Sequence, residues 1–379
     1  MEGKRSTPKT SDLLHKIRDF SRSILVDICN GRSPVVLINK FRTYCTNSAE
    51  NCLCSSSLPV GTEVLTLRRQ PHAHRIDQSV VDRAINDICI LLECSRHNLN
   101  VVSVAKGLMM GWIRFSEDGR KFDCIANPNT AQPVPVQVED VHDIHKCNSL
   151  AMNILSFAEY VLVVEKESVF QRLANDKFCS HNRCIVITGR GYPDVPTRRF
   201  LRLLTEKLHI PVYCLVDSDP YGFDILATYR FGSMEMAYDV ECLCIPDICW
   251  LGVFTSDYEN YALPSQCLLP LTTEDKKKIE ALLHRCYLQH EEPHWRLELE
   301  KMQDKGLKFE IEALSVHSLS FLSKEYLPSK IQFPPLNSPL SHRHVPNVSF
   351  DVVLMDYFSL SPVPLQPVMH RIDMSLNHI

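Results

Sequence analysis

The stretch PVYCLVDSDPYGFDIL, residues 211–226, is an apolar run that ends in two aspartates, Asp217 and Asp219. Its first half, rich in valine, leucine and cysteine, is typical of a buried strand, and its second half reads as the start of a helix. Residues i and i+2 of an extended chain lie on the same face. The two carboxylates are therefore expected to point together from the end of a buried strand.

The same order of strand and helix occurs twice before this stretch. Residues 159–167 (EYVLVVEKE) and 182–194 (NRCIVITGRGYPD) predict strands, and residues 168–178 and 197–209 predict the helices that follow them. This alternation predicts an α/β fold with a parallel sheet and right-handed crossovers. Further helices are expected at residues 222–232, 272–287 and 294–316.

The part of the chain before residue 159 has a different pattern. Residues 11–34 predict a helix with Ser11 as its N-cap and Gly31 as its stop, and a second helix opens with Ser79-x-x-Asp82 as a capping box. Two short strands are expected on either side of Asp118–Gly119, a strong hairpin signal. A helix followed by a hairpin is what a winged helix keeps if only its last helix and its wing remain.

These patterns divide the chain into six segments. We expect an N-terminal helical segment (1–42), an irregular segment (43–78), a remnant of a winged-helix domain (79–130), a linker with an insertion (131–158), an α/β domain with a helical C-terminal part (159–331) and a proline-rich tail (332–379). Seven prolines and no glycine among residues 333–379 predict that the tail is disordered.

The composition excludes several classes of protein. The net charge of −4 means that any contact with nucleic acid must come from local patches. No apolar run reaches the roughly 18 residues of a membrane span, so no membrane partner is expected. The 16 cysteines form no CxxC pair, which favours reduced intracellular thiols over a zinc site. A nucleotide-binding enzyme is disfavoured because neither GxGxxG nor GxxxxGK[ST] occurs.

Acidic residues follow two of the predicted strands. Glu165 comes after the first strand, and Asp217 and Asp219 come after the third. Carboxyl ends of parallel strands meet at one edge of a sheet. Carboxylates gathered there repel one another unless a cation lies between them, and such hard oxygen ligands suit Mg²⁺. The alternative is a polar turn in which Glu165 pairs with Lys166 or Arg190, and the pattern alone leaves both open.

A basic stretch between two glycines follows the middle strand. Gly189 and Gly191 would let the backbone approach a phosphate closely, and Arg190 and Arg198 would supply positive charge. The alternative is an ordinary strand-to-helix turn, with Arg199 and Arg202 on a solvated helix face. The lysine run at 276–278 is interpreted as a solvated helix surface.

Four stretches together resemble a known family: residues 159–167, 186–201, 215–234 and 312–331. They resemble the A subunit of topoisomerase VI, and especially its eukaryotic relative, the transesterase that makes meiotic DNA double-strand breaks, most closely in its plant members. The resemblance implies a winged-helix (CAP-like) domain, here truncated, followed by a toprim domain. It also implies that Glu165, Asp217 and Asp219 hold Mg²⁺.

The resemblance implies partners and a location as well. The expected partners are double-stranded DNA, a second A-type protomer and a topoisomerase VI B-type subunit, in the nucleus and on chromosomes. In dimers of the family, the tyrosine of one protomer is expected to meet the acidic cluster of the other, so that two half-sites cut the two strands.

The family's nucleophile has no counterpart in this sequence. It is the second of two adjacent tyrosines, just upstream of the helix that here begins near Gln78, where this chain reads PHAHRIDQSVVDRAI (71–85). No Tyr-Tyr pair occurs, and no tyrosine lies between Cys45 and Glu159. The segment is interpreted as missing at Asp77–Gln78, and Tyr44, the only upstream candidate, lacks the motif.

Residues 145–155 read as an insertion, and the proline-rich tail lies beyond the usual end of the family. Together with the missing segment, they suggest an alternatively spliced product or an imperfect gene model. The resemblance thus implies a component of a magnesium-dependent DNA-cleaving complex that initiates meiotic recombination, and the missing tyrosine predicts a form that is itself deficient in cleavage. The alternative is a non-catalytic regulatory or partner-binding variant of that complex.

Overall fold

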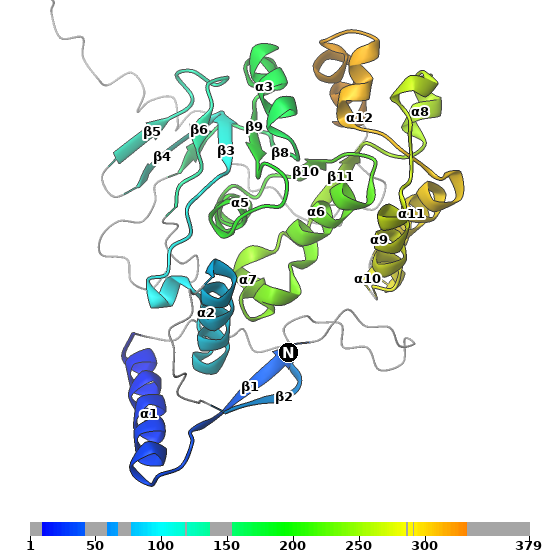
Figure 1. Ribbon diagram of the computed structural model, residues 1–379. Helices are drawn as coiled ribbons and strands as arrows, with labels where there is room; N and C mark the ends of the chain where they lie inside the picture. The colour runs from blue at the N-terminus through cyan, green and yellow to red at the C-terminus, as the bar shows by residue number, and fades with distance from the viewer. Residues whose placement is uncertain are drawn as a thin grey trace, which may run out of the picture. The chain divides into compact units, whose positions relative to one another are not determined.

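The computed structural model describes residues 10–41, 59–66, 77–117, 120–136, 154–285, 287–290 and 292–331 (Figure 1). The turn at Asp118–Gly119, Tyr44, the greater part of the 145–155 insertion and the tail 332–379 lie outside the described residues.

A six-stranded sheet of order β11-β10-β8-β9-β3-β6 organises the α/β part. Its four parallel strands are β8 (Tyr160–Val164), β9 (Cys184–Thr188), β10 (Val212–Leu215) and β11 (Ile248–Gly252). The predicted parallel sheet is therefore confirmed at its centre.

The other two strands of this sheet each pair antiparallel with a neighbour and come from earlier in the chain. β3 (Leu108–Gly111) pairs with β9, and β6 (Gln132–Pro133) pairs with β3. They lie in the segments predicted as winged-helix remnant and linker. The predicted parallel sheet did not include this edge, because β3 and β6 join it through antiparallel pairing with β9 and with each other, which no strand–helix–strand pattern marks in the sequence.

Helices follow the strands, as the alternation predicted. They are α3 (Glu167–Asn175), α4 (Phe178–Asn182), α5 (Val195–Leu208), α6 (Pro220–Phe231), α7 (Val240–Leu243), α8 (Asp257–Asn260), α9 (Thr273–Leu283), α10 (Tyr287–His290), α11 (Pro293–Lys305) and α12 (Leu327–Ile331). The helix expected at 294–316 ends at Lys305, because Gly306 takes a left-handed φ of 65°. Residues beyond it form β13 (Leu307–Lys308), which pairs with β12 (Leu269–Pro270).

Each face of the central sheet has its own apolar core. Val161 and Val163 of β8 face a cluster that includes Phe200 of α5 and Phe223 of α6. Leu162 and Val164 face the opposite cluster, with Phe170 of α3, Tyr326 and Leu327. All five residues of β8 are buried because helical segments cover both faces, so the strand is a continuous apolar run instead of an alternating one.

The N-terminal part contains α1 (Thr10–Cys29), β1 (Val35–Phe41), β2 (Pro59–Thr66) and α2 (Gln78–Leu92). β1 and β2 form an antiparallel pair. This pair spans the segments predicted as helical (1–42) and irregular (43–78), so both descriptions are wrong for the paired residues. α1 contacts α2 through Leu13, which packs with Leu92 and Cys94.

The predicted hairpin is confirmed, and both predicted helix starts are corrected. β4 (Ile113–Glu117) and β5 (Arg120–Asp123) pair antiparallel, and β7 (Leu155–Ser156) adds a third strand. Asp77, and not Ser79, caps α2, because its side chain accepts from the Gln78 amide. Ser11 lies inside α1, which begins at Thr10. None of the described helices is long and apolar enough to cross a membrane.

Candidate metal and DNA site

Two predicted acids meet where neighbouring strands end. β8 and β10 pair in a register that puts Val164 opposite Leu215, so the residues just after them lie close together. The amide of Asp217 donates to Glu165 Oε2 at 2.9 Å. The sheet register therefore brings together two carboxylates that are 52 residues apart in the chain.

Asp219 has a role in the helix that follows. It is the N-cap of α6, and its Oδ1 accepts from the Gly222 amide at 2.6 Å. Gly222 is required by close packing: a Cβ there would lie 2.6 Å from the Asp217 carbonyl oxygen and 3.0 Å from Glu165 Oε2. The glycine thus allows α6 to begin directly against both acidic strand ends.

Replacing Gly222 with alanine is expected to distort this edge of the sheet. The new methyl group would meet backbone atoms that have no room to move, so the free energy of unfolding should fall by about 1–3 kcal/mol. Urea unfolding of the variant beside the parent chain measures this. Equal midpoints and equal slopes would show that the strand end accommodates the added methyl group without loss of stability.

Burial puts the carboxylates in an unfavourable environment for charge. Burial, with the nearby charge of Asp217, raises the pKa of Glu165 to about 8. Burial raises the pKa of Asp217 to about 6 despite the opposing contact with Lys166, and it also raises the pKa of Asp219. The folded chain therefore disfavours the ionised form of these carboxyl groups when no cation is bound.

Lys166 is a site residue that the sequence analysis assigned to another partner. Its ammonium binds Asp217 Oδ2 at 2.8 Å, Glu312 Oε2 at 3.0 Å and Glu310 Oε2 at 3.1 Å. Arg190 pairs with Glu167. The alternative in which Glu165 pairs with Lys166 or Arg190 is therefore wrong. The position of Lys166 next to Glu165 in the sequence indicated that it belongs to the site. Its actual partners could not be predicted, because they lie in segments far away in the sequence.

The donor chemistry fits Mg²⁺, although the carboxylates are not arranged as a ready ligand set. Among the described residues, no group of three His, Cys, Asp or Glu side chains could hold a metal as it stands. Asp217 Oδ1 already accepts from the Ile311 amide, and Lys166 occupies its other oxygen. Glu165 Oε1, in contrast, accepts no hydrogen bond from the described residues. A cation bound here would favour the ionised form of these acids, and Glu165, Asp217 and Asp219 are the residues that would hold it.

The metal-free chain is expected to lose stability as the pH rises from 5 to 8. Because the folded-state pKa values of Asp217 (about 6) and Glu165 (about 8) are raised, the fold holds these protons more tightly than the unfolded chain does. The stabilisation is complete below the ordinary pKa values of these acids and is lost as the pH rises through the raised ones. Mg²⁺ should therefore raise the melting temperature more at pH 8 than at pH 5.

Thermal melting in EDTA and in Mg²⁺ tests this, with Glu165→Gln as the matched variant. The variant should show a flatter dependence on pH because it removes the more strongly shifted group. A melting temperature that is constant over this range in the parent chain would contradict the expectation.

The glycine-flanked loop after β9 does not offer its amides to a phosphate. The amide of Arg190 donates to Thr188 Oγ1 at 3.1 Å, and that of Gly191 donates to the Glu165 carbonyl at 2.9 Å. The glycines shape the loop instead. Gly191 has a φ of 85°, and a Cβ on Gly189 would lie 2.7 Å from the Tyr229 hydroxyl.

The basic residues of this stretch divide into exposed and buried ones. Arg190 is exposed enough to meet DNA, whereas Arg198 is 2% exposed and donates to the Leu243 carbonyl inside the domain. Arg198 as a DNA contact is therefore a wrong prediction for this fold. The solvated face proposed for Arg199 and Arg202 is also wrong, because Arg199 is buried and Arg202 donates to the Cys244 carbonyl.

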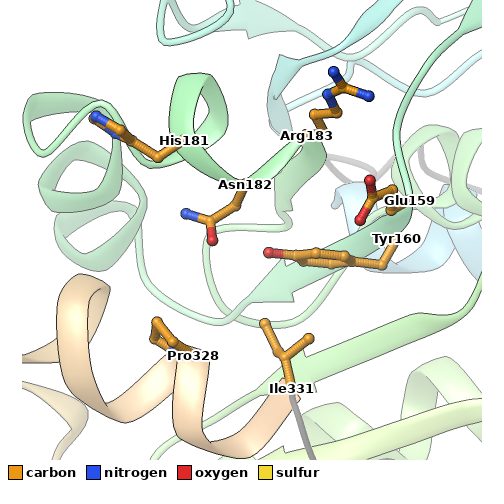
Figure 2. Close-up of a pocket in the computed structure, with 7 residues that line it drawn as sticks. All are labelled: Glu159, Tyr160, His181, Asn182, Arg183, Pro328 and Ile331. Atoms are coloured by element: carbon orange, nitrogen blue, oxygen red, sulfur yellow. The ribbon is translucent and has the colours of Figure 1, made fainter.

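A hollow of about 340 Å³ lies at the opposite end of the strands (Figure 2). Tyr160 opens β8 and Arg183 immediately precedes β9, so this hollow is at the amino-terminal edge of the sheet. The Tyr160 hydroxyl points into it beside Asn182 and finds no hydrogen-bond partner among the described residues. None of the predicted metal or DNA residues lines this hollow.

The sheet order and the acidic strand ends define a toprim-type domain. The family model for the toprim domain shared by the A subunit of topoisomerase 6 and Spo11 matches residues 160–331. The chain belongs to this topoisomerase VI/Spo11 family of A-type proteins.

Curated relatives support this over most of the chain. "Meiotic recombination protein SPO11-1" of Arabidopsis thaliana is 59% identical over 366 residues, which cover 88% of this chain and 98% of the relative. The protein of the same name from Oryza sativa subsp. japonica is 54% identical, over 84% of this chain and 92% of its own length. The A subunit of DNA topoisomerase 6 from Arabidopsis thaliana is 39% identical, over 68% of this chain and 57% of its own length.

Proposed function

We propose that this chain acts in meiotic recombination, in a topoisomerase VI-like complex that makes DNA double-strand breaks by magnesium-dependent tyrosyl transesterification. The observation that carries this is 59% identity to a meiotic recombination protein across 98% of that protein's length. The proposed partners are double-stranded DNA, a second A-type protomer and a B-type subunit. The proposed location is the nucleus, on chromosomes.

In this proposal the chain supplies the acidic half of a cleavage site. Glu165, Asp217 and Asp219 would hold Mg²⁺, which supplies positive charge for the phosphate and the leaving oxygen. The Lys166 ammonium neutralises Asp217. It also binds Glu310 and Glu312, which fixes its position beside the Asp217 carboxylate. Arg190, which lies on the loop after β9 and pairs with Glu167, would contact a DNA phosphate.

We further propose that the chain lacks the nucleophilic half. α2 begins at Gln78, directly after its cap Asp77, and the sequence has no tyrosine between Cys45 and Glu159. The alignment with the Arabidopsis relative spans 366 positions but takes in only 88% of the 379 residues of this chain, so the relative has positions without a counterpart here. This supports the interpretation of a missing segment.

A second candidate is a non-catalytic variant that regulates the complex by occupying a partner. The missing tyrosine favours it, since such a chain would retain a folded toprim domain and compete with cleaving protomers. The two candidates differ in the action of a dimer with a tyrosine-bearing protomer. The first predicts that this mixed dimer cuts one DNA strand, and the second predicts that it cuts neither.

Complementation tests the family role. Arabidopsis plants that lack their SPO11-1 protein would receive this chain, or this chain with the tyrosine-bearing segment of the relative inserted between Asp77 and Gln78. We expect paired chromosomes at meiosis only with the restored chain. A restored chain that accumulates in the nucleus and still gives no pairing would overturn the proposed function.

A further inference from the structure

Two exposed tyrosines flank the acidic edge of the sheet. Tyr221 lies in the first turn of α6, two residues after Asp219, and is 40% exposed. Tyr192 lies in the loop after β9, next to Gly191, and is 43% exposed. These two half-exposed rings lie beside the candidate metal site, where a ligand bound at the acidic strand ends could reach them.

A buried carboxylate holds Tyr192 in place. The Tyr192 hydroxyl donates to Asp224 Oδ2 at 2.7 Å, and Lys278 Nζ binds the same oxygen at 2.6 Å. Arg285 binds Asp224 Oδ1 at 2.5 Å. Asp224 is buried on α6 and bound by two cations, so it fixes the hydroxyl end of Tyr192 while the ring remains partly in solvent.

The same lysine reaches the other tyrosine. Lys278 Nζ lies 5.8 Å from the centre of the Tyr221 ring. The lysine run at 276–278 was interpreted as a solvated surface, but this member of it joins α9 to α6 and to the loop after β9. Tyr192, Tyr221 and Lys278 thus form one surface, which we call the tyrosine platform.

Tyr192 is poorly suited to replace the missing nucleophile. Burial and the hydrogen bond to Asp224 raise the pKa of Tyr192, so its hydroxyl holds its proton more tightly than a free phenol does. An attacking oxygen would also have to leave the carboxylate that it binds. The exposed ring, and not the hydroxyl, is the part of Tyr192 that remains available to a ligand.

We propose that the tyrosine platform stacks against unpaired DNA nucleotides at the acidic edge, with Arg190 on the neighbouring phosphate. Base faces stack on aromatic rings whatever the base, and nearby cations hold the backbone. Ionised carboxylates at this edge repel a DNA phosphate unless a metal ion lies between them. A stacking contact with a base does not meet this repulsion. The inference rests on the proposed function, which brings DNA to this site. It adds the residues that contact the unpaired nucleotides.

The test measures DNA binding by the full chain in Ca²⁺, with fluorescence anisotropy on a duplex that has a single-stranded overhang. Tyr192→Ala and Tyr221→Ala should each weaken binding about tenfold, the size expected for losing one stacked base. Tyr192→Phe keeps the ring and should bind within about twofold of the parent. Phe157→Ala is the matched control, since Phe157 is an aromatic residue with 41% exposure away from this edge. Melting curves establish that each variant is folded.

A second readout locates the contact directly. Overhangs that carry 5-iododeoxyuridine should cross-link under ultraviolet light to Tyr192 or Tyr221, and mass spectrometry identifies the residue. Alanine variants that bind like a DNA-binding parent, with no cross-link at either position, would overturn the inference and leave the proposed function standing. A folded parent chain that binds none of the DNA would count against both.

Discussion

A mixed dimer of this chain with a tyrosine-bearing A-type protomer is expected to cut one DNA strand and leave the other intact. In the proposed arrangement, the partner's tyrosine meets Glu165, Asp217 and Asp219 of this chain, and that half-site is complete. The other half-site has the partner's acids but no tyrosine. Removing a nucleophile costs on the order of 10⁶-fold in rate in well-studied enzymes, so the second strand should remain uncut.

The assay uses supercoiled DNA, Mg²⁺ and a B-type subunit, with differently tagged protomers. Nicked circles with protein attached to 5′ ends, and the tag of the partner on every adduct, are the expected products. Dimers of this chain alone should give no adduct. Insertion of the tyrosine-bearing segment between Asp77 and Gln78 should restore double-strand cleavage, and the same insertion with phenylalanine at the nucleophile should not.

Glu165→Gln in this chain gives the matched control for the acidic half. It should abolish the nicks made by the mixed dimer, since the only complete half-site uses this carboxylate. An adduct that carries the tag of this chain would show that another tyrosine has taken the catalytic role, with Tyr44 as the first to examine. A mixed dimer that makes no nicks would favour the regulatory variant over the cleaving component.

Loss of the Asp257 carboxylate is expected to destabilise the fold by about 3–5 kcal/mol, the cost of breaking a buried charge pair. Asp257 is fully buried in α8 and accepts from the Tyr326 hydroxyl at 2.6 Å and the Phe254 amide at 2.9 Å. Lys330 Nζ binds its other oxygen at 2.8 Å. Asp257→Ala would leave a buried hydroxyl and a partly buried ammonium without their acceptor.

Urea unfolding of Asp257→Ala measures the loss. Asp247→Ala is the matched control, because Asp247 is exposed and its removal should change the free energy of unfolding by less than about 0.5 kcal/mol. Since Tyr326 and Lys330 belong to the C-terminal helical part, proteolysis near residue 331 should also become faster in Asp257→Ala. Equal stability of the two variants would mean that water replaces the carboxylate at little cost.

Local sequence pattern was sufficient for the elements that carry the acids. The apolar runs before Glu165 and Asp217 are short, rich in valine and bounded by turn residues, so they predicted buried strands. The alternation of these runs with helices predicted that the strands are parallel and that the acids follow them at the same end of the sheet. The helix starts were less certain, because Asp77 and Ser79 are both good caps and only the backbone conformation at Asp77 decides between them.

Tertiary structure alone decided which charges meet. Lys166 and Asp217 are 51 positions apart, and Tyr192 and Asp224 are joined across 32 positions; no window of sequence contains either pair. Arg190 and Arg198 look alike in the sequence, yet the register of α5 buries one and leaves the other on the loop. The sequence determined the strands, the acids and the absence of the tyrosine pair. Long-range packing determined which charged side chains face solvent, because the burial of a residue depends on the distant segments that pack against it.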